Sequence, residues 1–148
     1  MNRQSPHANE PFGRVVPKSH ANDLCLSVSP VPSAVGLVRK RLGRHLQKLG
    51  RDDLTHTALL VASEIVTNAV REHQEHCPHV PIIIRAFPQP DGRFRIEVDN
   101  VSPARPEIRS ALPLEESGRG LAIASTLSDE MGYSLRGNGG KTVWTVLS

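Results

Sequence analysis

The sequence contains few cysteines and no long apolar run, and each of these absences excludes a class of protein. Cys25 and Cys77 are its two cysteines, too few for a disulfide framework and suited to a reducing compartment. No apolar stretch approaches the roughly 20 residues that a membrane-spanning helix needs. The polar N-terminus also lacks the apolar core of a signal peptide. We therefore expect a cytoplasmic protein with no membrane partner.

The chain length allows one folded domain. Its 148 residues, 38% of them hydrophobic, can fill a single core. Residues 1–20 are polar, contain proline and show no periodicity, so we expect a flexible tail there. The folded domain is then expected to span residues 21–148.

The clearest helical pattern covers residues 54–73, which contain neither glycine nor proline. Asp52 and Asp53 precede it and offer N-caps and a favourable charge at the helix start. The apolar residues recur at three- and four-residue steps and predict one buried helix face. They are Ala58, Val61, Ala62, Ile65, Ala69 and Val70.

The rest of the chain alternates between short strand and helix patterns. We expect strands at residues 24–28, 80–87, 94–98, 133–136 and 142–147, and a helix from about residue 33 to residue 49. Residues 88–92 have the composition of a hairpin turn. Residues 99–117 are proline-containing and aperiodic, as in a functional loop. Gly118, Arg119 and Gly120 end that loop, and a helix follows that we expect Gly132 to close.

The central helix also carries a polar side. Glu64 and Asn68 lie four residues apart, so their side chains project next to each other. A carboxylate can act as a general base, and an amide oxygen can bind a hard cation. A solvated helix face is the alternative explanation on this pattern alone.

The helix predicted at residues 33–49 has a strongly basic outer face. Residues 1–51 hold nine Lys or Arg against Glu10 and Asp23. Such a face can meet an acidic protein or nucleic acid, or can simply be solvated. No aromatic residues are interleaved to stack on bases, which makes nucleic acid the weaker option. The basic residues are Arg39, Lys40, Arg41, Arg44, Lys48 and Arg51.

Two further segments have the composition of known sites. His73, His76, Cys77 and His79 crowd into one loop rather than forming the two spaced pairs of a structural zinc site, so we favour an ordinary loop. Residues 140–142, Gly-Lys-Thr, are not a P-loop, because the earlier glycine is missing and a strand follows. The helix start at residues 118–120 remains suited to an anion.

The order of these motifs resembles the ATP-binding domain shared by gyrase-type ATPases, Hsp90 chaperones, histidine kinases and MutL-type repair proteins. The motifs are Glu64-x-x-x-Asn68 on a helix, a hairpin strand, a proline-rich loop, Gly118-Arg-Gly-Leu121 and a terminal Gly-Gly-Lys-Thr142-Val-Trp144. The likeness covers roughly residues 24–147. The short length is most similar to the anti-sigma-factor serine kinases. This resemblance implies an α/β two-layer sandwich with a mixed, mostly antiparallel sheet and helices on one face.

The resemblance also implies a site for ATP and Mg²⁺. Asn68 would bind Mg²⁺, and Glu64 would be the candidate base. Gly118, Gly120 and the neighbouring residues Arg119 and Leu121 would meet the phosphates, with residues 104–117 as a lid. Thr142 would lie near the adenine, Trp144 would pack in the core, and Arg109 and Arg119 are candidate γ-phosphate contacts.

One departure from the family pattern concerns adenine. The family usually has Asp-x-Gly where the second hairpin strand ends. Alignment on Val98 and Pro103 places Asn100 and Ser102 at those positions. Asn100 keeps an acceptor oxygen without the charge. The other register uses Asp99 but puts Val101 in place of the glycine.

The resemblance implies an ATP-binding regulator of transcription. Such a protein would bind a sigma factor, phosphorylate a Ser or Thr of an antagonist protein, or both, and a homodimer is compatible with it. Two alternatives stay open: an ATP-dependent protein-binding module without kinase activity, and a basic nucleic-acid-binding regulator.

Overall fold

The computed structural model describes residues 22–101, 116–137 and 139–148. Within them five strands and three helices follow one another, at nearly the positions that the periodicity predicts. In chain order these elements are β1 (Leu24–Val28), α2 (Ser33–Lys48), α3 (Asp52–His76), β2 (Ile82–Pro88), β3 (Phe94–Asn100), α4 (Glu116–Leu127), β4 (Glu130–Leu135) and β5 (Lys141–Leu147).

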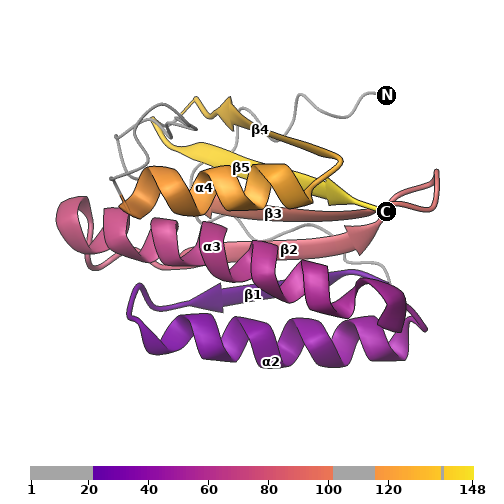
Figure 1. Cartoon of the computed structure of the whole chain (residues 1–148). Coiled ribbons are helices and arrows are strands. Elements are labelled where there is room, and N and C mark those ends of the chain that lie inside the picture. The colour runs from indigo at the N-terminus through magenta and orange to yellow at the C-terminus, as the bar shows by residue number, and fades with distance from the viewer. Residues whose placement is uncertain (1–21, 102–115, 138) are drawn as a thin grey trace.

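The strands form one sheet with the order β1-β2-β3-β5-β4. A mixed, mostly antiparallel sheet was expected. Every pairing between described strands is antiparallel, so these strands form a purely antiparallel sheet. Figure 1 shows α2, α3 and α4 side by side in a layer over one face of this sheet. The two-layer sandwich with helices on one face is therefore confirmed.

The core lies between the sheet and the three helices, with α3 at its centre. The predicted apolar face of α3 is buried along its whole length, from Ala58 to Val70. Small residues such as Ala58, Ala62 and Ala69 let the helix approach the strands closely. On the sheet, Ile84, Ile96 and their neighbours meet this face. Burying each large aliphatic side chain contributes about 1.5–3 kcal/mol, so α3 is fixed in both position and rotation.

The start of α3 differs from the expected capping. Arg51 occupies the N-cap position without a side-chain cap, and Asp52 and Asp53 are the first residues of the helix. The Asp53 carboxylate instead pairs with the Arg51 guanidinium, with an Nε–Oδ1 distance of 3.1 Å. Both acidic residues still stand at the positive end of the helix dipole.

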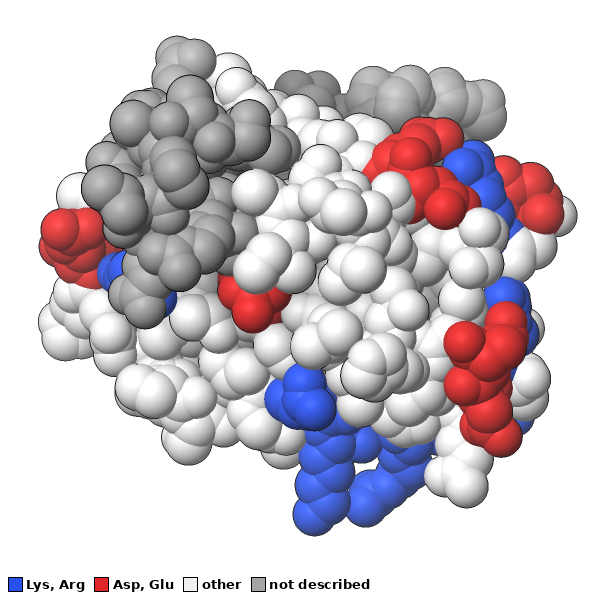
Figure 2. All heavy atoms as spheres, in the orientation of Figure 1, with Lys and Arg blue, Asp and Glu red and all other residues white. Residues whose placement is uncertain are grey.

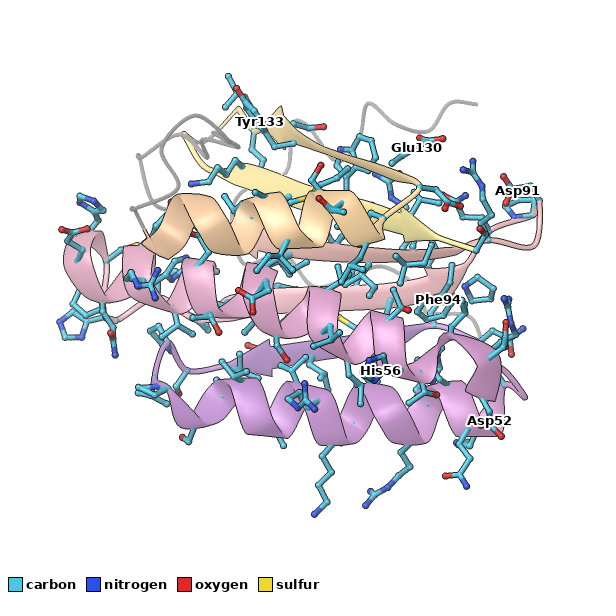
Figure 3. All side chains as sticks on the ribbon, in the orientation of Figure 1. Asp52, His56, Asp91, Phe94, Glu130 and Tyr133 are labelled. Atoms are coloured by element: carbon cyan, nitrogen blue, oxygen red, sulfur yellow. The ribbon has the colours of Figure 1, made fainter. Side chains whose placement is uncertain are left out.

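The turn between β2 and β3 is tied to its surroundings by arginines. Arg51 donates to the Gly92 carbonyl oxygen at 3.0 Å. Arg93 pairs with Asp91 and, across the sheet, with Glu130 on β4, each at 3.0 Å. Figure 3 shows Asp91 and Glu130 at the same end of the sheet. These ion pairs are partly exposed and hold the hairpin in position with little net stability.

Two expectations about the C-terminal region are wrong. Gly132 does not close a helix but lies inside β4, because α4 ends at Leu127 and the Ser128 hydroxyl caps the carbonyl of Ala124. Trp144 does not pack in the core, since it faces away from the helices. A Cβ at Gly132 would lie 2.7 Å from Trp144 Cζ2, so the glycine leaves room for the indole ring.

Gly132→Ala should therefore destabilise the protein by about 1–3 kcal/mol, because the added methyl group overpacks against a bulky ring. Gly36→Ala is the matched control, since a Cβ at Gly36 meets nothing within 4 Å and the residue lies inside α2. That control should gain about 0.5–1 kcal/mol. Urea unfolding followed by circular dichroism measures both. Equal stability of the two variants would contradict the close contact.

Candidate functional site

The Glu72 carboxylate on α3 brings together three elements at the end of the sheet. Its Oε1 accepts hydrogen bonds from Asn100 Nδ2 on β3 at 2.6 Å and from Lys141 Nζ on β5 at 2.8 Å. Its Oε2 accepts a long bond of 3.5 Å from Asn68 Nδ2, one turn earlier on the helix. Two predicted site residues, Asn68 and Asn100, thus share one partner. We refer to Asn68, Glu72, Asn100 and Lys141 as the Glu72 cluster.

The Glu72 cluster is largely shielded from water. Asn68 and Asn100 are buried, and Lys141 is only 1% exposed. Lysines are almost never buried to this degree unless they are paired, so the Glu72 carboxylate is what permits Lys141 in this position. The side chain of Glu72 itself keeps 16% exposure. Neither Glu72 nor Lys141 is recognisable as a site residue from the sequence pattern.

Thr142 does not join this cluster. Successive strand residues point to opposite faces, and Asn100 pairs with Lys141 whereas Asp99 pairs with Thr142. The Thr142 hydroxyl accordingly donates to Asp99 Oδ1 at 2.8 Å on the face away from the helices. The prediction that Thr142 lies near the adenine stays a prediction, but Lys141 rather than Thr142 shares the helix-facing side with Asn100.

The outer face of the sheet carries its own ionic network. Asp99 is paired with Arg85 at 2.7 Å and with Arg136 at 3.1 Å. Arg85 also pairs with Glu97 at 3.0 Å, and Arg95 approaches the other Glu97 oxygen at 2.7 Å. Burial disfavours the Glu97 charge, but the two arginines outweigh it and lower the pKa of Glu97. With its carboxylate committed to this network, Asp99 stands apart from Asn68.

Glu64 lies one helical turn before Asn68 and is half-buried. It forms no hydrogen bond or ion pair with any residue in the described part of the chain. Its carboxylate is thus not committed to a structural contact, unlike that of Glu72.

The other predicted site residues lie at the start of α4 or outside the described residues. Gly118, Arg119 and Gly120 belong to the first turns of α4, which starts at Glu116 rather than after the glycines. Leu121 is buried against the core. Ser102, Arg109, the predicted tail at 1–20 and nearly all of the predicted lid at 104–117 lie outside the described residues.

His73, near the end of α3, forms hydrogen bonds with backbone groups just before β2 and just after β3. It is fully buried, with Nδ1 2.8 Å from the Val80 carbonyl oxygen and Nε2 3.2 Å from the Val101 amide nitrogen. Donation from Nδ1 and acceptance at Nε2 fix a neutral imidazole. Burial lowers the pKa of His73 accordingly. Within the described ranges no three His, Cys, Asp or Glu residues are grouped as metal ligands.

The residues present still fit one hard cation beside a polyanion. Asn68 directs its Nδ2 toward Glu72, which leaves the amide Oδ1 as an oxygen ligand. A single protein oxygen is a sparse donor set, but it suits Mg²⁺, which keeps several waters and takes further oxygens from substrate phosphates. The site therefore fits a magnesium–nucleotide complex better than a metal ion held by protein alone.

A basic surface lies on α2, away from the Glu72 cluster. Lys40, Arg41, Arg44 and Lys48 are exposed, and Figure 2 shows basic side chains projecting at the molecular edge that α2 forms. Arg39 instead crosses to α3 and donates to the Ser63 hydroxyl at 2.7 Å. None of the helices in the described segments is long and apolar enough to cross a bilayer.

The sequence of this domain places the chain in a known family. Residues 28–147 match the family model of the histidine kinase-like ATPase domain, so the protein belongs to that family. No curated protein matches the chain in sequence.

Two solved structures are similar to this one. The RsbU and RsbW domains of Rv1364c from Mycobacterium tuberculosis match with a TM-score of 0.64 and 25% identity, over 84% of this chain and 32% of that one. This chain therefore spans about a third of that protein's length. The SiaB–SiaC complex of Pseudomonas aeruginosa matches with a TM-score of 0.62 and 16% identity, over 84% of this chain and 88% of that one. The second likeness concerns the fold alone.

The stability of the protein should fall on acidification because of His73. Its pKa is lower in the folded state than the unfolded value of about 6.5, so unfolding takes up a proton in that range. Stability is then complete above about pH 6.5 and decreases as the pH falls toward the folded pKa. Burial is the main cause of the lowered pKa, and it outweighs the Val80 and Asn100 hydrogen bonds, which favour the charged imidazole.

His73→Leu should flatten this pH dependence and cost about 1–3 kcal/mol at neutral pH, because the part-buried Val101 amide loses its acceptor. His56→Asn, on an exposed position of the same helix, is the control (Figure 3). Urea midpoints between about pH 5 and about pH 7.5 measure both effects. A His73→Leu profile parallel to that of the wild type would exclude His73 as the titrating group.

Proposed function

We propose that this protein is an ATP-binding regulator of the anti-sigma-factor kinase type, which binds MgATP and phosphorylates or sequesters a protein partner. One observation carries the proposal. Asn68 and Asn100 come from α3 and β3 and meet at the Glu72 carboxylate, on the helix-facing side of the sheet. Asn68 is proposed to bind the magnesium ion and Asn100 to face the adenine. The chain belongs to the histidine kinase-like ATPase family.

The register at the end of β3 supports Asn100 rather than Asp99 as the residue that faces the nucleotide. Asp99 points to the outer face, where two arginines and the Thr142 hydroxyl surround it. Asn100 points toward α3. We propose that Gly118, Arg119 and Gly120 present the start of α4 to the phosphates, because backbone N–H groups at a helix start attract anions.

The proposed chemistry asks the chain mainly for positioning. Bound Mg²⁺ would neutralise charge on the phosphates. The Asn68 oxygen would hold that complex, and Glu64 would orient or deprotonate the hydroxyl of the partner. Glu64 has the free carboxylate that this role requires, one turn from Asn68 on the same helix.

A protein partner is part of the proposal. One similar structure is a complex of two proteins, and the other joins an RsbW domain to an RsbU domain. We propose a sigma factor or an antagonist of an anti-sigma factor as the partner here. The exposed basic residues of α2 are suited to an acidic protein surface.

Asn68→Ala should weaken MgATP binding about tenfold or more, equivalent to roughly 1.4 kcal/mol, because water alone replaces the amide oxygen poorly. Gln74→Ala, an exposed change further along α3, should leave the affinity unchanged. Isothermal calorimetry with and without Mg²⁺ measures the difference. The same affinity in both variants would remove Asn68 from the site, and a wild type that does not bind MgATP would end the proposal.

Glu64→Gln should separate a kinase from an ATP-dependent clamp. The partner is first captured from native cells in the presence of MgATP. The wild-type protein should then transfer radiolabelled phosphate from ATP to this partner. The variant should be slower by about 10²–10⁴, because the general base is lost, while ATP affinity changes only a few-fold. Glu75→Gln, on an exposed position of the same helix, is the matched control. Unchanged labelling by Glu64→Gln would exclude the role, and a wild type that binds but never labels would identify a clamp.

A further inference from the structure

The adenine end of the proposed nucleotide site contains the charged pair of Glu72 and Lys141. Lys141 is the cross-strand partner of Asn100, so the two side chains leave neighbouring strands on the same face. Both reach Glu72 Oε1, at 2.8 and 2.6 Å. An ammonium, an amide and a carboxylate therefore meet at one place beside the proposed base contact.

The two oxygens of Glu72 are used unequally by the described residues. Oε1 accepts both short bonds, whereas Oε2 has only the 3.5 Å contact from Asn68, at the limit of a hydrogen bond. A carboxylate offers about four lone-pair positions, so Oε2 retains acceptor capacity. Glu72 also keeps part of its surface open, unlike Lys141.

We propose that Glu72 recognises the amino group at position 6 of adenine, with Lys141 as the cation that holds this carboxylate charged and in place. This inference rests on the proposed binding of ATP and names the residue that determines the base. The recognition edge of adenine presents an N–H donor beside a ring-nitrogen acceptor. Glu72 supplies the acceptor that this N–H donor requires.

The Glu72–Lys141 pair explains how the proposed adenine site can have the uncharged Asn100 where the family usually has an aspartate. An amide alone would give adenine a neutral hydrogen bond, whereas a carboxylate gives a charge-assisted one. The carboxylate comes from α3 rather than from β3, and Asn100 Nδ2 orients it. Asn100 is thus a positioning residue, and Glu72 contacts the base.

The test compares ATP with purine riboside 5′-triphosphate, which has the same phosphates but no 6-amino group. Wild-type protein should bind ATP about tenfold or more tightly than the analogue in Mg²⁺ buffer, because a site built to bond an N–H group rejects a ligand without it. In Glu72→Gln/Lys141→Met this preference should fall to about threefold or less, with affinity for the analogue nearly unchanged. Removing both charges leaves no unpaired buried charge, so the double variant should fold.

Glu97→Gln is the matched control, since it removes one carboxylate from an arginine pair on the opposite face of the same sheet. It should keep the wild-type preference for ATP. Circular dichroism verifies that every variant is folded.

Four results would overturn the inference. A folded double variant could keep the wild-type preference, or it could lose ATP and the analogue equally, which would make the pair structural. A wild type that binds GTP more tightly than ATP would assign the carboxylate to a different base. Wild-type protein that binds neither triphosphate would refute the proposed function as well, and this separates the two failures.

Discussion

The contact between α3 and the sheet fixes the rotation of the helix, and the positions of the polar groups depend on it. Ala58, Ala62 and Ala69 are small and fully or almost fully buried, so the helix cannot turn without opening gaps in the core. Residues four apart share a side, which carries Asn68 and Glu72 together toward the end of β3. The same rotation buries His73 beneath the adjacent loops. A substitution far from the polar residues but inside this apolar contact would therefore move all of them at once.

The pleat of β3 and β5 separates two groups of charges that are close in sequence. Asp99 and Thr142 face outward into the arginine network, while Asn100 and Lys141 face inward toward Glu72. Buried ion pairs add little net stability, because desolvation offsets the attraction between the charges. Their effect is on register, since a one-residue slip of β5 would place the Lys141 charge against the outer arginines and leave Glu72 without its cation.

The periodic elements were predictable, and the faces of the last strands were not. Apolar spacing located α2, α3 and the hairpin of β2 and β3 to within a few residues, because each buries one regular face. Lys141 and Thr142 are both polar, so alternation could not tell which of them points inward. Glu72 looked like one more charge near a helix end, and only the three-dimensional arrangement reveals its partners. The sequence favours a helix stop at Gly132, because nothing in it indicates that an indole ring lies against this glycine.

Trp144 is the only tryptophan in the chain and lies on the outer face of the sheet. The Arg95 guanidinium carbon lies 4.5 Å from the centre of its ring, a cation–π contact. Indole emission responds to nearby charge and to solvent. The intrinsic fluorescence of Trp144 therefore reports changes in the arginine contacts and the solvent exposure of this face. The Glu72 cluster lies on the other side of the same strands. A change in emission when a ligand binds would thus mean that the strands themselves had shifted, which gives the protein a built-in optical reporter of strain across its sheet.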